Sequence, residues 1–109
     1  MSDGAKTLSK EAFEKAISSE KPVFVDFFAV WCGPCQMMLP LIDELADEAK
    51  DYEVYKMDID QAPEIAAKYG VMSVPTFIVF QNGEEKERMM GAMPKELLAQ
   101  KIEAVIKQK

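Results

Sequence analysis

The chain has 109 residues, of which 49% are hydrophobic and 29% are charged. This is the composition of a folded globular protein, so we expect one domain over residues 1–109 and not a disordered or fibrous chain. Thirteen basic and nineteen acidic residues leave a net charge of −6. The sequence has no basic block, which argues against a nucleic-acid or anionic-membrane partner.

The first elements are a short strand and a helix. An edge strand is predicted over residues 4–8. Ser9 is then placed as the N-cap of the helix, because its hydroxyl can accept a backbone N–H of the first turn. Leu8 and Phe13 have the spacing of a hydrophobic staple across that cap. Pro22 interrupts the helical pattern, so the helix ends before it.

The middle of the chain predicts two more strand and helix pairs. Residues 23–30 form a nearly continuous apolar run, which is typical of a strand buried on both faces of a parallel sheet. A helix with one apolar and one acidic side is predicted from residue 34 to about residue 50. A further strand is predicted over residues 54–59. Pro63 and Gly70 then mark the start and the end of a short helix.

The last part of the chain predicts a hairpin and a helix. Residues 77–80 are strongly apolar, and Asn82-Gly83 is a strong signal for a two-residue hairpin turn. The next strand, near residues 86–90, should therefore be antiparallel, and Pro94 opens a final helix. The order β-α-β-α-β-α-β-β-α predicts an α/β fold with a mixed central sheet and helices on both faces.

The segment Trp31-Cys32-Gly33-Pro34-Cys35 lies where the buried strand turns into the second helix. Pro34 suits the first helical turn, so Cys32 falls near the N-cap. The free N–H groups and the dipole of the helix stabilise a thiolate there. We expect Cys32 to be exposed and to attack substrate disulfides. Cys35, about one turn further in, should be more buried and should resolve the mixed disulfide.

Three other interpretations of the cysteine pair are open at this point. A structural disulfide would close so short a loop that it constrains the unfolded chain by only about 2 kcal/mol, against about 3 for a 15-residue loop. A structural zinc site usually needs four Cys or His ligands, and the chain has two Cys and no His. The third possibility is a chance pair of buried cysteines, since cysteine is often buried.

The cellular compartment is predicted from the N-terminus and the cysteine content. No basic start followed by a long apolar region is present, so a secretory signal is not expected. The longest apolar stretch, residues 27–32, is far too short to span a bilayer. With only two cysteines, these features indicate a reducing cytoplasm, where disulfides are usually transient and functional. A mature secreted form that has lost its signal would show the same features.

The chain closely resembles the thioredoxin family over almost its whole length. The motifs that carry the resemblance are specific and fall in the family's order. They are Val25-Asp26-Phe27-Phe28-Ala29, Trp31-Cys32-Gly33-Pro34-Cys35, Lys56-Met57-Asp58-Ile59-Asp60, Tyr69-Gly70-Val71, Ser73-Val74-Pro75-Thr76, Asn82-Gly83 and Gly91-Ala92.

The resemblance implies a five-stranded mixed sheet with four helices and the reduction of protein disulfides. It also implies recharging by a thioredoxin reductase, no metal and no bound cofactor beyond the redox-active disulfide; we expect a monomer. Two departures from the family pattern stand out. Gln36 replaces a usual Lys or Arg, so one positive charge is missing beside the pair, and Phe28 replaces a frequent Trp.

Asp26 interrupts the apolar run and is the most informative residue outside the pair. Burial would raise the pKa of its carboxyl, because desolvation disfavours the charged form. Such a group could exchange a proton with Cys35 through water near neutral pH. A carboxylate at a sheet edge, or one tied up structurally, is the alternative. The resemblance favours the proton-transfer role, and it matches Lys56 to a lysine that approaches this carboxyl.

The resemblance also assigns supporting and substrate-binding residues. Trp31, Gly33, Pro34, Lys56 and Pro75 support the catalytic group Cys32, Cys35 and Asp26. A cis Val74–Pro75 bond is expected, with the backbone of Val74 left free to pair with a substrate strand.

An apolar docking rim is predicted around Cys32, in which methionine adapts to varied partners. Its residues are Trp31, Met72, Val74, Gly91, Ala92 and Met93. Five other methionines are expected in the core: Met37, Met38, Met57, Met89 and Met90.

Two rival functions are weighed against disulfide reduction. A disulfide oxidase or isomerase uses the same chemistry, but Gly33-Pro34 offers neither a charge nor an extra donor to stabilise the reduced thiolate. A non-catalytic interaction domain could use the fold as a scaffold, since a fold alone does not prove a function.

Overall fold

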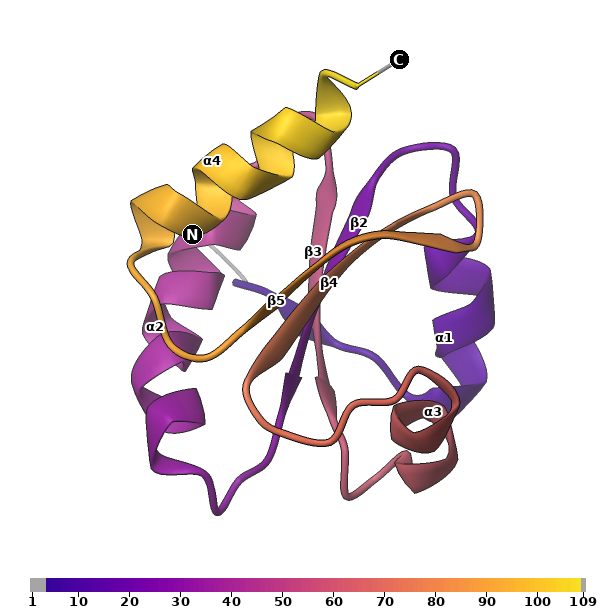
Figure 1. Ribbon diagram of the computed structural model, residues 1–109, viewed down its shortest axis with the longest axis vertical. Helices are drawn as coiled ribbons and strands as arrows, with labels where there is room; N and C mark the ends of the chain where they lie inside the picture. The colour runs from indigo at the N-terminus through magenta and orange to yellow at the C-terminus, as the bar shows by residue number, and fades with distance from the viewer. Residues whose placement is uncertain (1–3, 109) are drawn as a thin grey trace.

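A central five-stranded sheet with helices on both sides forms the molecule (Figure 1). The computed structural model describes residues 4–108. The elements in chain order are β1 (Lys6–Thr7), α1 (Lys10–Ile17), β2 (Val23–Phe28), α2 (Gly33–Glu48), β3 (Glu53–Asp58), α3 (Pro63–Lys68), β4 (Thr76–Gln81), β5 (Glu84–Met90) and α4 (Lys95–Ile106). The predicted order of strands and helices is confirmed.

The strand order in the sheet is β1-β3-β2-β4-β5. β1 and β2 both run parallel to β3, whereas β4 runs antiparallel to β2 and β5 antiparallel to β4. The predicted mixed sheet is therefore confirmed. β2 lies at its centre with all six residues buried, which explains why its sequence is apolar throughout except at Asp26.

The two faces of the sheet are covered by different pairs of helices. In Figure 1, α2 and α4 lie on one side and α1 and α3 on the other. Side chains alternate along β2, so Phe24 joins the cluster formed with α2 and α4, whereas Val25 and Phe27 join the cluster under α1 and α3. Asp26 is in phase with Phe24 and therefore faces α2, the helix that carries the cysteines.

Local sequence signals act where they were expected. The Ser9 side chain accepts a hydrogen bond from the N–H of Ala12 at 3.2 Å and caps α1. Asn82 and Gly83 have φ angles of 54° and 82°, which is the left-handed backbone that a two-residue hairpin turn requires. This tight turn lets β5 begin at Glu84, two residues before its predicted start.

The two edge strands of the sheet, β1 and β5, are short or highly charged. β1 has only two residues, fewer than the five predicted over 4–8. β5 forms the opposite edge and begins with five consecutive charged residues, 84–88. Short length and charge are two ways in which proteins prevent the pairing of edge strands with other chains. In the part of the chain that the structure describes, no helix has the length and hydropathy needed to cross a membrane.

Two neighbouring leucines in α4 test the assignment of its buried face. Leu98 is fully buried, whereas Leu97 is 40% exposed. We predict that Leu98→Ala lowers the free energy of unfolding by about 2 to 5 kcal/mol, because it leaves a cavity under the sheet. Leu97→Ala removes the same atoms from the same helix and should lower the free energy of unfolding by less than about 1 kcal/mol. Urea unfolding measures both, and equal losses would contradict this assignment.

Candidate active site

The cysteine pair lies at the start of α2. Cys32 is the N-cap residue, and its Sγ accepts the N–H of Cys35 at 3.2 Å. Pro34 occupies the first helical turn, as predicted. The two cysteines form a disulfide, with their Cα atoms 5.2 Å apart. The sulfur of Cys32 thus takes the position in which a helix N-terminus stabilises negative charge.

The burial of the pair corrects one expectation. Cys35 is fully buried and Cys32 is 6% exposed, so Cys35 is the deeper residue, as predicted. Cys32 was expected to be exposed, and this was wrong. The reason is that both cysteines pack in a small apolar cluster with Phe28 and Ala29, and Val74 lies against it. Phe28 has the packing role expected for it.

A loop before β4 faces the disulfide. The Sγ atom of Cys32 lies 3.6 Å from the carbonyl oxygen of Val74. The Val74–Pro75 peptide bond is cis, which confirms the expectation. The loop is held by a hydrogen bond of 2.7 Å from the Thr76 hydroxyl to the carbonyl of Ser73 and by one of 3.0 Å from the N–H of Gly91 to the carbonyl of Pro75.

The backbone of Val74 has no strand partner in the sheet. β4 starts only at Thr76. Neither the N–H nor the carbonyl of Val74 is paired with another backbone group among residues 4–108. An unpaired backbone segment beside a reactive sulfur can take up a strand from another chain.

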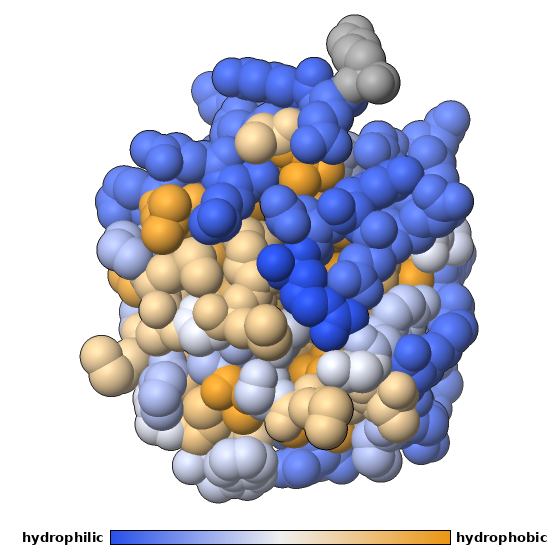
Figure 2. Space-filling view, viewed as in Figure 1, coloured by the Kyte–Doolittle hydropathy of each residue, from blue (hydrophilic) through white to orange (hydrophobic). Residues whose placement is uncertain are grey.

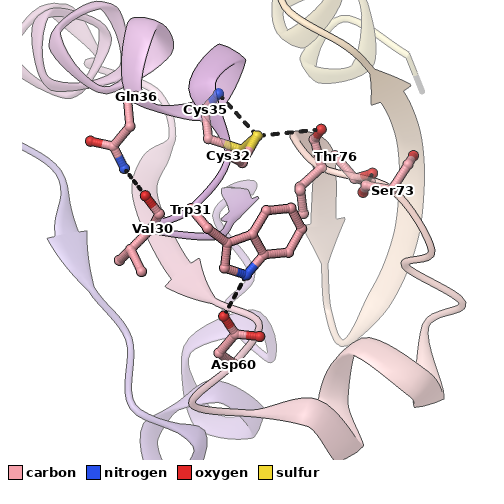
Figure 3. The surroundings of a disulfide bond; sticks show 9 residues. Val30, Trp31, Cys32, Cys35, Gln36, Asp60, Ser73 and Thr76 are labelled. Atoms are coloured by element: carbon pink, nitrogen blue, oxygen red, sulfur yellow. Dashed lines mark hydrogen bonds between the residues drawn. A yellow bond between two sulfur atoms is a disulfide. The ribbon is translucent and has the colours of Figure 1, made fainter.

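Trp31 lies beside the disulfide and is 68% exposed (Figure 3). Its indole Nε1–H donates a hydrogen bond of 2.8 Å to the carboxylate of Asp60, which fixes the ring next to Cys32. Sequence reasoning did not single out Asp60, although it belongs to one of the motifs. Its signal would have been a carboxylate placed directly after a parallel strand, at the sheet edge that carries the cysteines.

Gln36 holds the segment that precedes the pair. Its side-chain amide donates a hydrogen bond of 3.2 Å to the carbonyl of Val30. The first turn of α2 contains no acidic residue, and Gln36 supplies no charge. The electrostatic support for a Cys32 thiolate on this helix therefore comes from backbone groups, above all the N–H of Cys35.

An open cleft of about 500 Å³ borders the disulfide. Its lining residues are Trp31, Cys32, Gly33, Pro34, Ile59, Met72, Ser73 and Val74. Three of the six residues predicted for the docking rim, Trp31, Met72 and Val74, thus meet at Cys32. Gly91 adjoins the loop through its bond to Pro75, whereas Ala92 and Met93 do not line this cleft.

The methionines divide into a buried and an exposed group. Met38, Met57 and Met89 are at most 6% exposed, which confirms their expected core position. Met37 and Met90 are 75% and 63% exposed, so the core prediction was wrong for these two. Met90 belongs to β5 but lies outside the core, and its Sδ is 4.0 Å from the Ser73 hydroxyl.

The carboxyl of Asp26 is buried without a hydrogen-bond partner among the described residues. Its burial raises the pKa of the carboxyl from 3.8 to about 7, because desolvation disfavours the charged form more than the nearby positive charge of Lys56 favours it. Asp26 lies in a central strand, which excludes the alternative of a carboxylate at a sheet edge.

Lys56 faces Asp26 across the parallel pair of β2 and β3. Its ammonium group, however, forms an ion pair with Asp43 of α2, at 3.7 Å. Asp43 also accepts the N–H of Ala5 at 3.0 Å. Lys56 therefore lowers the pKa of Asp26 through space while its ammonium group is drawn toward α2. Sequence reasoning missed Asp43, which looked like one of several solvent-facing acids on that helix.

Arg88 ties the loop before β4 to β5. Its guanidinium donates to the carbonyl oxygens of Tyr69 and Gly70 and to both carboxylate oxygens of Glu85, at 2.8 Å each for the carboxylate. Tyr69 and Gly70 follow the last turn of α3, and the cleft residue Met72 comes two positions later. The sequence offered no signal for this contact, because the charged run on β5 looked uniformly solvent-facing.

No cluster of three or more Cys, His, Asp or Glu side chains within residues 4–108 is arranged to hold a metal ion. A zinc interpretation of the pair therefore has no further ligands in this part of the chain.

The family model described as Thioredoxin matches residues 4–104. A chloroplastic thioredoxin M-type from Pisum sativum is 51% identical over 94 residues, which cover 85% of this chain and 55% of that protein. A thioredoxin from Alicyclobacillus acidocaldarius is 42% identical over 101 residues, covering 92% of this chain and 96% of that protein. The chain spans about half the length of the chloroplastic M-type relatives from pea and spinach.

The solved structures include a close match in shape. A mutant thioredoxin from Halobacterium salinarum NRC-1 has a TM-score of 0.88 to this chain at 33% sequence identity. The match covers 100% of this chain and 97% of that one. The arrangement of sheet and helices is therefore that of a solved thioredoxin structure.

The burial of Asp26 predicts a pH-dependent stability. Between pH 3.8 and about 7 the folded protein holds a proton that the unfolded chain has released, so its stability falls as the pH rises through this window. The full pKa difference corresponds to about 4 kcal/mol. We predict that Asp26→Asn, which cannot ionise, is increasingly more stable than the original protein from pH 4 to pH 7.

Urea unfolding of both proteins in their disulfide forms, at several pH values, measures the difference in their free energies of unfolding. The chain contains no histidine, and other groups cancel in the difference between the two proteins. A stability difference that stays constant over this range would contradict the assignment.

The contacts of Arg88 should slow the local opening of residues 69–71, which lead into the loop before β4. The Val71 N–H donates to the carbonyl of Ala66 at 2.8 Å. We predict that Arg88→Lys accelerates hydrogen exchange at this amide by about tenfold, because an ammonium group cannot hold two carbonyls and a carboxylate at once. Lys86→Gln, which removes an exposed ion pair with Glu84 on the same strand, is the control. Equal rates in both variants would refute a special role of Arg88.

Proposed function

The chain belongs to the thioredoxin family, and on this premise we propose that it reduces disulfide bonds in proteins through the Cys32/Cys35 dithiol. The observation that carries the proposal is the position of the pair. The sulfur of Cys32 caps α2 beside an apolar cleft, and Cys35 lies within bonding distance behind it. This geometry suits a thiol that reacts and a second thiol that resolves.

In the first step the Cys32 thiolate attacks one sulfur of the target disulfide. A bond forms between Cys32 and that sulfur, and the other target sulfur leaves as a thiolate. The N–H of Cys35 and the N-terminus of α2 stabilise the attacking thiolate before the reaction. The first turn of α2, residues 33–36, contributes no basic side chain, since Gln36 is neutral.

In the second step the Cys35 thiolate attacks the sulfur of Cys32. The intramolecular disulfide forms, the second target sulfur leaves as a thiolate, and the target has gained two electrons. Cys35 must lose its proton first. Asp26 is suited to accept this proton through water, because it faces α2 and burial raises the pKa of its carboxyl to about 7.

Target chains would dock across the cleft. Trp31 and Met72 line the cleft with Cys32 and offer exposed apolar contact, and the backbone of Val74, which has no backbone partner, can pair with an extended segment. Gly91 and Ala92 are small residues that permit a close approach from the side of β5.

The partners and the compartment complete the proposal. We assign the recharging of the disulfide to a thioredoxin reductase, and we propose that the chain acts as a cytoplasmic monomer without a bound cofactor. The support is chemical: a dithiol that acts repeatedly needs a reductant and a reducing compartment. The chloroplastic location of several relatives belongs to those proteins. Imaging of the tagged protein in its own cells tests the compartment.

Two rival functions predict different measurements. A disulfide oxidase or isomerase would have a more oxidising potential, which Gly33-Pro34 does not favour. Equilibration with glutathione buffers distinguishes the two. A scaffold protein would keep its biological activity when both cysteines are replaced by serine.

The proposed reaction is tested with an insulin-like protein disulfide and dithiothreitol as the reductant. We predict that Cys32→Ser abolishes turnover above the rate of dithiothreitol alone. Cys35→Ser should instead accumulate a mixed disulfide through Cys32, because the resolving thiol is missing. Mass spectrometry under non-reducing conditions detects this complex.

The matched control is the variant Cys32→Ser in the same trapping assay. It retains Cys35, which is fully buried, and should capture no target. Turnover by the double serine variant at the rate of the original protein would overturn the proposed function.

A further inference from the structure

Met72 has an exposure that no packing role explains. It is 96% exposed, more than any other large apolar side chain in the described part of the chain. It also lines the cleft together with Cys32 and Trp31. A flexible thioether therefore stands in water at the edge of the surface that a target disulfide must approach.

The surroundings of Met72 keep it in this position. The loop that carries it is tied to β5 by Arg88 on one side and to β4 by the Thr76 hydroxyl on the other. Figure 2 shows apolar side chains gathered in the lower half of the molecule, where Figure 1 places the start of α2 and the loop before β4. Met72 shares the lining of the cleft with Trp31 and Val74, so it is not an isolated exposed residue.

We propose that Met72 is an oxidation site at which a hydroperoxide controls the binding of protein disulfides. The inference rests on the proposed function of the cysteine pair. The Met72 sulfur attacks the terminal oxygen of the hydroperoxide, the O–O bond breaks and an S=O bond forms. The thioether loses two electrons, and the hydroperoxide is reduced to water or an alcohol.

The other methionines of the chain provide internal comparisons. Met38, Met57 and Met89 are shielded in the core. Met37 is 75% exposed but does not line the cleft. Met72 is the most exposed of these methionines and lines the same cleft as Cys32. An oxidant can therefore reach its sulfur easily, and the oxidation changes the surface on which a target would dock.

The consequence follows from the change in polarity. A sulfoxide is polar and chiral, whereas the thioether is apolar. A protein target that reaches Cys32, itself only 6% exposed, must cover the Met72 side chain and would have to remove water from the sulfoxide. A small disulfide can reach the sulfur without covering Met72. Oxidation should therefore weaken the reduction of protein disulfides selectively.

The experiment treats the disulfide form with hydrogen peroxide, since the Cys32–Cys35 bond protects both cysteines from the oxidant. Catalase then removes the peroxide. Peptide mapping by mass spectrometry gives the order of methionine oxidation, and Met72 should precede Met38, Met57 and Met89. Oxidation of the core methionines before Met72 would overturn the proposal.

Kinetics test the functional part. We expect the KM for a protein disulfide to rise on the order of tenfold after treatment, the scale of losing one buried methionine contact. The rate with a small aromatic disulfide should stay unchanged. Each treated protein is compared with its own untreated sample, so that a difference in activity between the untreated variants does not affect the result.

Two variants complete the design. Met72→Leu keeps an apolar side chain without a sulfur and should lose the sensitivity to peroxide, whereas Met37→Leu should retain it. An equal rise of KM in treated Met72→Leu would overturn the proposal, as would an equal loss with the small disulfide. If the untreated protein reduced neither disulfide, the proposed function would fail and the effect assigned to Met72 with it, while the mapped order of oxidation would still be readable.

Discussion

The structure depends on one hydrogen bond at the junction of β2 and α2, where the N–H of Cys35 meets the sulfur of Cys32 at 3.2 Å. The first residues of any helix have backbone N–H groups without partners inside the helix. Ser, Thr, Asp or Asn usually satisfies them. Here the reactive sulfur does so, and the group that begins the helix is the same group that carries the chemistry. The position of the sulfur is thereby fixed by the fold itself.

The rest of the site follows from this junction. β2 can deliver the sulfur to one place only because it is buried between two other strands and two helix layers. The same burial removes Asp26 from water and raises the pKa of its carboxyl toward neutrality. The burial of one strand thus provides rigid support for the disulfide and places beneath α2 a carboxyl whose pKa lies near neutrality.

Much of the architecture could be predicted from local patterns. The apolar run of β2, the cap at Ser9 and the Asn82-Gly83 turn each depend on residues close together in the sequence, so their signals are readable there. The cysteine pair was predicted from its place between a buried strand and a helix, whereas the cis bond before Pro75 was predicted from the family resemblance. Contacts between distant segments were not: Asp60, Asp43 and Arg88 looked like ordinary surface charges. Their roles arise only when the fold brings a partner to them.

The errors have the same origin. Cys32 was expected to be exposed because a helix start usually faces water, but the loop before β4 lies over it. Met37 and Met90 were assigned to the core from the usual behaviour of methionine, yet the helix and strand that carry them turn these side chains outward. Exposure is a property of the assembled layers and cannot be read from residue type alone.

The two edge strands of the sheet, β1 and β5, limit how this protein can pair with other chains. β1 is too short to template another strand. β5 presents a row of acidic and basic side chains to any approaching chain. Indiscriminate β-aggregation is thereby discouraged along both flanks. Within residues 4–108, the backbone of Val74 has no backbone partner and lies next to the sulfur, where a visiting chain can pair with it. Pairing with a visiting chain is therefore favoured beside the sulfur and discouraged along the flanks of the sheet.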